Sequence, residues 1–448
     1  MTITIIVIIY FAALLVLALK SNKQVKDSKD FIIAGRSGSE LDITGSLLAT
    51  VVGSSAILGT LNLTVSQGWA AMWFLFSASL GLWFLVPKAE AIYSHDKFTL
   101  PQLFGRFYGE SAKKISSIII PIAWVGIVAA QLVGAAKILV TLLGIGYEFA
   151  VIVAGVILIV YTVLGGQISI LKTDKLQAFL IYFGIFILAI SLFVKDTSVP
   201  FSTLSESFPF NQTFKISDLV ILLLTYSTTF LVGPDIYSRI FSASSASIGK
   251  KSVRNVALML IPFSIALCYV GMYINGLDLP MNSKGINFME FLKFNTSTVM
   301  FAICSLALLS AVLSSADTTL LSASIILMDF KDRRKDRMLY VTRVLVLVLG
   351  VFSVLIALKI SSIISILLTS LSFYSGAFVL PMVIALFSKM KPKGSANIAM
   401  ITGGLTALIG KVLVNQGWEY GNLIIILAFV LNGFCLFFVG RSHVDHTN

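Results

Sequence analysis

The chain has 448 residues, of which 57% are apolar and only 12% are charged, and its mean hydropathy is +0.95. Soluble domains of this length do not have such a composition, whereas membrane proteins do. We therefore expect an all-helical, multi-pass protein of the cell membrane whose surroundings are the lipid bilayer. The net charge of +12 does not require a nucleic-acid partner, because the topology below explains it.

Thirteen stretches are long and apolar enough to cross a bilayer core about 30 Å thick, which takes roughly 20 helical residues. They are 2–20, 41–66, 70–93, 115–143, 147–166, 174–194, 217–238, 253–276, 298–329, 340–359, 361–388, 395–415 and 421–440. The first stretch lacks a basic n-region and an A-x-A-like cleavage site, and basic residues follow it. We therefore interpret it as a retained helix and not as a secretory signal.

Lys and Arg are distributed unevenly between the alternate ends of these helices. If the N-terminus lies outside, 26 of the 33 Lys and Arg fall in cytoplasmic loops and helix ends, as the positive-inside rule requires. This pattern predicts an external N-terminus and a cytoplasmic C-terminus. Lys137 is the one basic residue well inside a predicted helix, where it either extends to the outer interface or attracts an anionic substrate.

The expected membrane helices lack the residues that an enzyme would need. The three histidines lie in loops or in the tail: His95, His443 and His446. No carboxylate pair or His–Asp pair supports acid–base catalysis within the helices. The three cysteines are far apart, so neither a disulfide framework nor a metal spacing is present. We do not expect an enzyme.

Two of the predicted helices contain interruptions. The helix at 41–66 carries Gly45, Gly53 and Gly59 among small hydroxyl residues, and the helix at 217–238 is interrupted by Gly233-Pro234. Such glycines serve either close helix packing or local unwinding that exposes backbone carbonyls. Paired broken helices at corresponding places in two halves of a chain are the best sequence indication of a transporter site.

The segment 310–324, SAVLSSADTTLLSAS, places several hydroxyls and one carboxylate inside a long apolar helix. At 3.6 residues per turn, Ser310, Ser314, Asp317 and Thr318 fall near one helix face, with Ser315 at its edge. Polar and ionisable groups at this depth are costly unless they bind something. We therefore predict a cation site made of oxygen ligands, with a small-residue packing face as the alternative.

Four motifs make the chain resemble the sodium:solute symporter family. They are DFIIAGRS (30–37), YTVLGGQISILKTDKLQ (161–177), DIYSRIFSA (235–243) and SAVLSSADTTLLSASIILMDF (310–330). The resemblance implies the LeuT-type fold of two inverted five-helix repeats, with one extra N-terminal and two extra C-terminal helices. The chain, 1–448, would then be one transporter domain, divided into 1–40, repeat one at 41–194, repeat two at 217–388, and 395–440.

The resemblance also implies a sodium ion between the first helix of repeat one and the third helix of repeat two. Its ligands would be the carbonyls of Ala49, Val52 and Ala311 and the hydroxyls of Ser314 and Ser315. Neutral oxygens suit a hard monovalent ion that must also leave. Na⁺ is therefore the expected coupling ion.

Some relatives hold a second sodium slightly deeper. Its aspartate aligns with Asp174, and its two hydroxyls align with Asp317 and Thr318, so that one ligand is here a carboxylate. These three residues form a candidate second cation or proton site, although Asp174 also fits a helix boundary between two lysines. Arg239, which matches a family arginine on the cytoplasmic side, is expected in inner-gate or loop contacts.

The sequence defines the substrate-binding residues less closely than the sodium ligands. Sugar carriers of the family use a glutamine and a glutamate where this chain has Ala56 and Leu75, so hexose transport is not expected. Gln131 aligns with an arginine that binds carboxylate in an acid-transporting relative. The candidate substrate residues are Ser54, Ser55, Thr60, Trp73, Phe74, Gln131, Tyr226, Thr229, Phe230, Phe373 and Tyr374. Each aromatic residue also fits ordinary helix packing.

We therefore predict a sodium-coupled symporter that imports a small organic solute by alternating access and functions as a monomer. An organic acid, an amino acid or a vitamin is favoured over a sugar, and the fold does not choose among them. A proton-coupled transporter and a solute sensor on the same fold remain the alternatives.

Overall fold

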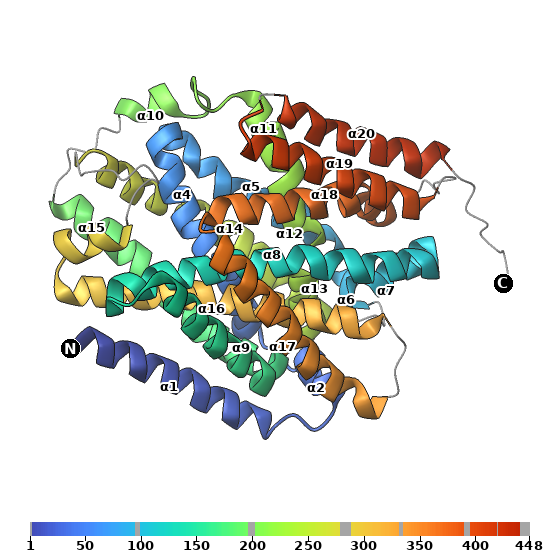
Figure 1. The fold of residues 1–448 in the computed structure, drawn as a ribbon, viewed down its shortest axis with the longest axis horizontal. Helices are drawn as coiled ribbons and strands as arrows, with labels where there is room; N and C mark the ends of the chain where they lie inside the picture. The colour runs from blue at the N-terminus through green and yellow to red at the C-terminus, as the bar shows by residue number, and fades with distance from the viewer. Residues whose placement is uncertain are drawn as a thin grey trace.

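The computed structural model describes residues 2–94, 99–195, 202–277, 288–330, 335–388, 395–418 and 420–439. All three histidines lie outside these ranges. The described residues form a bundle of helices (Figure 1). The α-helices are α1 (Thr2–Asn22), α2 (Ser28–Ile33), α3 (Glu40–Val51), α4 (Ser54–Gln67), α5 (Trp73–Leu85), α6 (Ala89–Ser94), α7 (Leu100–Tyr108), α8 (Glu110–Leu143), α9 (Tyr147–Lys195), α10 (Ser202–Ser207), α11 (Ile216–Leu222), α12 (Thr228–Val232), α13 (Pro234–Ser242), α14 (Ala246–Asn275), α15 (Phe288–Asn295), α16 (Thr298–Asp329), α17 (Lys335–Lys359), α18 (Ile363–Phe387), α19 (Ala396–Asn415) and α20 (Gly421–Phe438). Short 3₁₀ turns follow at Ala34–Arg36, Gly68–Met72 and Val86–Lys88, and a π-helical turn, η4, at Leu223–Ser227.

Eleven segments among the described residues are long and apolar enough to cross a membrane. Two of them contain two of the predicted spans each. The Ser55–Ser94 segment turns at Gly68, whose φ is +57°. The 49 residues of α9 would extend about 70 Å if straight, more than twice the membrane core, but Gly166 interrupts them at φ +57°. With these divisions every one of the thirteen predicted spans has a counterpart, and the all-helical, polytopic prediction is confirmed.

Both interrupted helices are broken at a glycine, although in the first one only Gly53 lies at the break, while Gly45 and Gly59 lie inside helices. Helix α3 ends at Val51, and α4 begins at Ser54 after the extended residue Gly53. The second one runs through α11, η4 and α12 to Val232, passes Gly233 in an extended conformation, and resumes as α13 at Pro234. Proline at the first helical position suits this restart, because its missing N–H would have no partner there.

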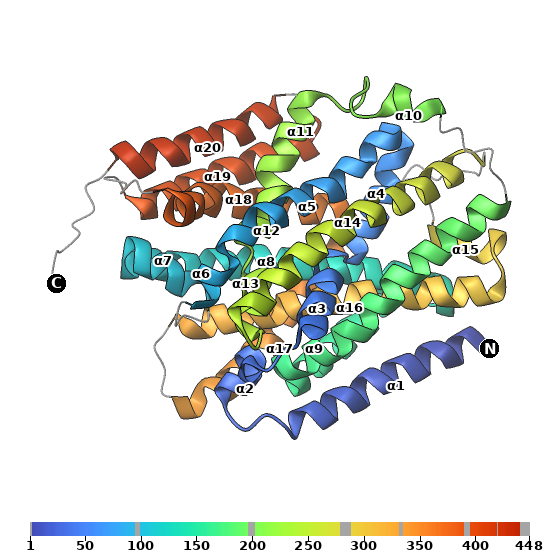
Figure 2. The ribbon, with the colours of Figure 1, turned by 180° about the vertical axis from the view of Figure 1, so that it is seen from behind.

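The centre of the bundle is α16, which packs against α3, α8 and α9 (Figures 1 and 2). Every residue from Ala307 to Ile326 is buried, so this helix is covered by protein on all sides. Helix α1 lies at one side of the bundle, and the α19–α20 pair lies at the opposite side. The hydroxyl-rich segment is thus placed in the interior and not at the lipid boundary.

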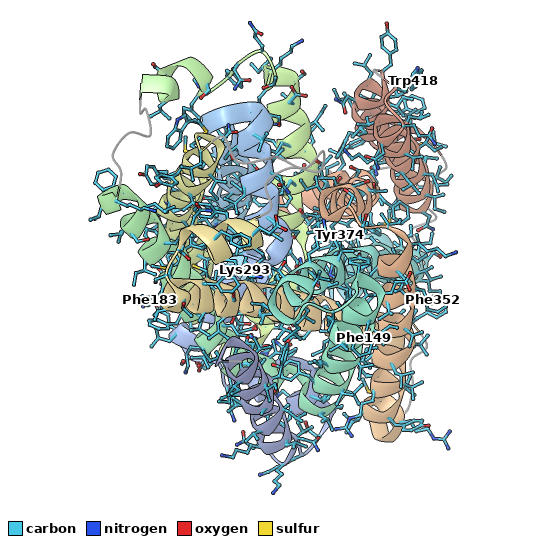
Figure 3. The ribbon with its side chains drawn as sticks, turned by 60° about the vertical axis from the view of Figure 1, so that its left-hand side comes forward. Phe149, Phe183, Lys293, Phe352, Tyr374 and Trp418 are labelled. Atoms are coloured by element: carbon cyan, nitrogen blue, oxygen red, sulfur yellow. The ribbon has the colours of Figure 1, made fainter. Side chains whose placement is uncertain are left out.

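Large apolar side chains cover the periphery. Phe183 and Phe352 lie at opposite edges of the bundle, whereas Tyr374 lies in its interior (Figure 3). The two phenylalanines are 45% and 56% exposed, and Tyr374 is fully buried. A soluble protein rarely exposes so many large apolar side chains, so this surface fits contact with lipid.

Three of the four sequence motifs meet in space. The Phe31 ring occupies the place that a side chain at Gly166 would fill, since a Cβ there would lie 2.4 Å from the ring. The Gly38 N–H donates to the Ser242 carbonyl (3.0 Å), and the Ser244 N–H donates to the Gly38 carbonyl (2.9 Å). The segment before α3 is thereby joined to the segment after α13.

Candidate functional site

The break after α3 faces the middle of α16. The Ser315 hydroxyl lies 2.9 Å from the Thr50 carbonyl and 3.2 Å from the Ala49 carbonyl, to which it can donate. Because α3 ends at Val51 and the Val52 N–H closes the last hydrogen bond, to the Leu48 carbonyl, the carbonyls that follow have no partner within the helix and carry the negative end of the helix dipole. The hydroxyl groups of α16 therefore lie next to backbone carbonyls at the C-terminal end of α3 that have no partner within that helix.

Gly53 permits this approach. A Cβ at Gly53 would lie 2.5 Å from the Ser315 hydroxyl and 2.8 Å from the Gln131 amide nitrogen. Neither side chain could stay in place against a larger residue. Glycine is thus needed here for close approach as well as for the break itself.

The five predicted sodium ligands gather around this contact. Ala49 and Ser315 touch directly, and Val52 follows the end of α3. Ser314 is fully buried, and its hydroxyl has no hydrogen-bond partner in the described part of the chain; Ala311 is buried one turn earlier. The Thr50 carbonyl, which the sequence did not indicate, is the nearest one to Ser315. Neutral oxygens of this kind fit a monovalent hard cation.

Three other hydroxyls of the segment have hydrogen-bond partners within the protein. Ser310 shares a hydrogen bond with Tyr10 of α1 (2.8 Å), and the Ser324 hydroxyl donates to the carbonyl of Leu320 in its own helix (2.7 Å). The Thr319 hydroxyl donates to the Ser315 carbonyl (2.6 Å). Only part of the hydroxyl face is therefore open to a ligand.

Arg239 lies in the interior and is completely buried. Its guanidinium forms an ion pair with Asp174 (3.2 Å), donates to the Ser46 hydroxyl (2.9 Å), and donates to the Thr318 hydroxyl. The Ser46 hydroxyl in turn donates to Asp174 (2.5 Å). We expected Arg239 in inner-gate or loop contacts, but it contacts two of the three residues predicted for a second cation.

Asp317 adds a second carboxylate to this cluster. It is completely buried, and one of its oxygens accepts from the Thr318 N–H (2.5 Å). The other oxygen of Asp317 and one oxygen of Asp174 have no partner among the described residues. Two carboxylates and one guanidinium leave one negative charge uncompensated if all are ionised. A buried unpaired charge is costly, so the cluster fits one further cation or one proton.

A cavity of about 60 Å³ adjoins the break. Its walls come from both broken helices and from α8, α16 and α18: Thr50, Val51, Gly53, Ser55, Trp124, Ile127, Gln131, Tyr226, Thr229, Phe230, Asp235, Ser315, Thr319, Leu367 and Leu371. Five predicted substrate residues are among them, namely Ser55, Gln131, Tyr226, Thr229 and Phe230. The Gln131 amide donates to the Ser55 hydroxyl (3.0 Å), which links α8 to the start of α4.

Asp235 is the one carboxylate among these walls, and the candidate substrate residues did not include it. It stands in the first turn of α13, where the helix dipole favours a carboxylate. Within the described ranges no lysine or arginine forms an ion pair with it. An ionisable residue directly after Gly233-Pro234 at membrane depth was the available signal.

A second cavity, of about 240 Å³, lies on the other side of an aromatic pair. The Phe74 and Tyr226 rings stack with centroids 4.2 Å apart. Phe74 lines the larger cavity and Tyr226 lines the smaller one. The pair therefore separates the two spaces.

The other predicted substrate residues make contacts elsewhere. The Thr60 hydroxyl donates a hydrogen bond to the Ala56 carbonyl in its own helix, and the Trp73 indole N–H donates one to the Pro209 carbonyl. Tyr374 donates to the Val232 carbonyl (2.5 Å), next to the second break. Phe373 packs toward Gly404 of α19. The Ser54 side chain lies outside what the structure describes.

Comparison with known proteins gives a consistent result. The sodium:solute symporter family matches residues 31–403. Sodium/proline symporter 2 of Staphylococcus saprophyticus is 24% identical over 98% of this chain and 92% of its own length. An osmoregulated proline transporter of Bacillus subtilis is 24% identical over 90% and 87%. The sodium/proline symporter of Escherichia coli is 23% identical over 92% and 87%.

Two solved structures resemble the fold. A Na⁺-coupled sialic acid symporter in a substrate-bound outward-open state superposes with a TM-score of 0.81 over 99% of both chains, at 17% identity. A nucleobase-cation-symport-1 family transporter in a closed conformation superposes with a TM-score of 0.56 over 90% of this chain and 92% of its own, at 12% identity.

Proposed function

Because this chain belongs to the sodium:solute symporter family and is a sodium-coupled solute symporter of the LeuT fold, we propose that its solute is a small zwitterion of the amino-acid class. The solute and Na⁺ move inward together by alternating access. The observation that carries the coupling is the contact of the Ser315 hydroxyl with the Ala49 and Thr50 carbonyls at the break of α3.

In this proposal Na⁺ binds the carbonyls of Ala49, Val52 and Ala311 and the hydroxyls of Ser314 and Ser315. The ion would bridge α3 and α16 and so stabilise the conformation in which these two helices are in contact. A tenfold sodium gradient supplies about 1.4 kcal/mol, and a potential of 100 mV adds about 2.3 kcal/mol per charge. Together these are enough to concentrate a neutral solute several hundredfold.

The lining of the smaller cavity, called the central cavity below, favours the binding of a zwitterion. Asp235 offers a carboxylate for an ammonium group, and the start of α4 at Ser54 and Ser55 presents backbone N–H groups and a positive dipole end to a carboxylate. Ala56 and Leu75 are buried and apolar, so their side chains cannot form hydrogen bonds with the hydroxyl groups of a sugar. Relatives named for proline transport favour the same class.

We also propose the topology that the sequence predicts. The N-terminus would lie outside and the C-terminus in the cytoplasm, with repeat one at 41–194 and repeat two at 217–388. The uneven distribution of Lys and Arg supports this orientation. The two breaks, at Gly53 and Gly233, fall in the first helix of each repeat. A single chain contains both cavities, which supports function as a monomer.

The buried cluster of Asp174, Asp317 and Arg239 supports a second coupled ion. Its uncompensated negative charge would be neutralised by another Na⁺ or by a proton. Proton coupling is therefore the second candidate function, and it rests on the unpartnered oxygens of the two aspartates.

Uptake into proteoliposomes tests the proposal. Vesicles with an inside-negative potassium diffusion potential should accumulate a small amino acid such as L-proline when Na⁺ is outside, and not when choline replaces it. A thermal-shift screen of amino acids, monocarboxylates and hexoses in Na⁺ and in K⁺ identifies the solute class independently. Equal accumulation with and without Na⁺ would contradict sodium coupling, and stabilisation by hexoses alone would contradict the solute class.

A further inference from the structure

Two buried side chains in the wall of the central cavity have a polar atom without a hydrogen-bond partner in the described part of the chain. They are the indole nitrogen of Trp124 on α8 and the hydroxyl of Thr50 in the last turn of α3. Trp124 is 2% exposed and Thr50 is 8% exposed. Thr50 directly follows Ala49, a proposed sodium ligand, so its hydroxyl cannot be separated from the ion site. Trp124 lies on another helix, and its unpaired N–H calls for a partner that enters the cavity.

Other polar side chains of this wall already have partners. The Gln131 amide donates to the Ser55 hydroxyl (3.0 Å), and the Thr229 hydroxyl donates to the Tyr226 carbonyl. These groups are held by the protein itself. The Trp124 indole N–H, by contrast, is left for a molecule that occupies the cavity.

The indole ring is fixed in its place by packing. The Tyr374 ring meets it edge to face, with centroids 4.5 Å and planes 62° apart. The Tyr374 hydroxyl donates to the Val232 carbonyl (2.5 Å), next to the second helix break. Leu367 and Leu371 of α18 add apolar wall beside them. An indole N–H donates and never accepts, so the group that binds here must be a hydrogen-bond acceptor.

Trp124 lies at a different height in the bundle from the start of α4. Gln131, which contacts Ser55 there, lies seven residues after Trp124 on α8. Seven helical residues span about 10 Å along the axis. The proposed function assigns the start of α4 to the carboxylate of the solute and Asp235 to its ammonium group. The indole N–H therefore serves a third group of the solute.

The charges of the wall restrict what this third group is. Asp235 is a carboxylate, and the described residues of the wall include no lysine, arginine or histidine. A second negative charge on the solute would have no cation in the wall to offset it, and an unpaired charge is costly at this depth. A neutral oxygen has no such cost, and it pairs well with an indole N–H.

We infer that Trp124 is a specificity-determining residue that donates a hydrogen bond to a neutral oxygen on the side chain of the solute. The inference deepens the proposed function and rests on it for the amino-acid class. An amino acid with a side-chain hydroxyl or amide is then the preferred solute. L-Proline, which has no such oxygen, is a weaker one, because it leaves the buried N–H unpaired.

Matched pairs of solutes test this role. L-Threonine and L-valine have nearly the same shape, and L-glutamine and L-methionine have similar lengths, so each pair differs mainly in a side-chain oxygen. In native protein the KM of Na⁺-driven uptake should be about tenfold lower for the oxygen-bearing member of at least one pair. Trp124→Phe keeps a ring against Tyr374 and removes the N–H. It should abolish this preference while leaving the KM of the apolar member and the half-saturating Na⁺ concentration in place.

The control variant is Trp83→Phe, because Trp83 lies on α5 and is 48% exposed. It should keep the native preference. The absence of a preference in native protein, or a preference that survives Trp124→Phe, would overturn the inference and leave the proposed function standing.

A second measurement does not depend on the folding of that variant. The chain has five tryptophans, so ¹⁵N-indole labelling gives five N–H signals. That of Trp124 is assigned with Trp124→Phe or, by elimination, with phenylalanine variants of the other four. Binding of the preferred solute in Na⁺ should move the Trp124 proton signal downfield, as a new hydrogen bond does. A signal that stays in place would refute the role of Trp124.

The two proposals can fail separately. If no amino acid is taken up with Na⁺, the proposed solute class fails. The solute that the thermal-shift screen then identifies is added to the labelled protein, and the Trp124 signal still decides whether its N–H binds the solute.

Discussion

The rings of Phe74 and Tyr226 stack with centroids 4.2 Å and planes 20° apart, and each ring lines a different cavity. A stacked pair of this kind is worth about 0.5–1.5 kcal/mol beyond its buried area. The stack therefore forms a thin barrier between the larger and the smaller cavity. Its energy is small enough for thermal motion to separate the two rings.

Phe74→Ala should weaken the retention of solute in the central cavity. Loss of the stacking energy corresponds to an increase of about two- to tenfold in the dissociation rate. The measurement is release of labelled solute from protein in Na⁺ after rapid dilution. Phe76→Ala is the control, because Phe76 packs against Trp73 and Phe208 and not against Tyr226. Unchanged release from the Phe74 variant would mean that the stack is not a barrier.

Ser315→Ala should raise the Na⁺ concentration for half-maximal uptake about tenfold. The variant loses one hydroxyl ligand and the contact with the Ala49 and Thr50 carbonyls, a change of about 1.4 kcal/mol. Initial uptake rates over a range of Na⁺ concentrations give this value. Ser324→Ala removes a buried hydroxyl of the same helix whose hydrogen bond among the described residues is to Leu320, and it should leave the Na⁺ dependence in place. Equal Na⁺ dependence in both variants would refute the sodium-site assignment.

Gly53→Ala should abolish transport while Gly59→Ala should not. A Cβ at Gly53 would lie 2.5 Å from the Ser315 hydroxyl, whereas a Cβ at Gly59 meets nothing closer than 3.7 Å. Both changes add the same methyl group to small residues of one broken helix. Uptake normalised to the amount of protein in the membrane separates them. Full activity in the Gly53 variant would show that α3 and α16 need not approach as described.

Arg239→Gln should lower thermal stability sharply. It leaves Asp174 buried without its ion-pair partner, and breaking one partner of a fully buried pair costs about 3–5 kcal/mol. Adding Asp174→Asn should recover part of this loss, because the orphaned charge is then removed. Thermal unfolding of the purified proteins in detergent measures both. A double variant no more stable than the single one would contradict the charge argument.

Asp317→Asn should simplify the coupling of transport to ions. The change removes the uncompensated charge of the cluster and with it the need for a second cation or proton. We expect the native protein to show a Na⁺ Hill coefficient above one or solute-coupled proton uptake, and the variant to show a coefficient of one without proton uptake. Uptake rates and a pH-sensitive dye inside the vesicles report the two quantities. A coefficient of one without proton movement in both proteins would rule out the second ion.

The sequence predicted those features that depend on local pattern. Apolar length predicted all thirteen spans. Gly53 marked the first break and Gly233-Pro234 the second, because a helix unwinds more easily where a residue lacks a Cβ or an N–H. The resemblance to the family implied that Ser315 lies close to the end of α3. These are features that neighbours in the chain or in a motif determine.

Features that depend on three or more helices escaped the sequence. In the sequence, Arg239 is one of many basic residues beside a loop. Only the packing of α3 and α16 against α13, together with the ion pair to Asp174 of α9, shows that it is buried. The position of Asp235 directly after a helix break was a sequence signal, but only the packing shows which cavity its carboxylate lines. The larger cavity likewise exists only because α4, α11, α18 and α19 meet there.

The two hydrogen bonds between Gly38 and the segment Ser242–Ser244 also have a mechanical consequence. They tie the inner half of the first broken helix to the inner half of the second, so that α3 and α13 would rotate as one rigid body. Gly53 and Gly233 would then be its paired hinges. An ion that holds α3 against α16 would at the same time fix the position of Asp235 on α13, so that sodium could control the site for the solute's ammonium group without touching it.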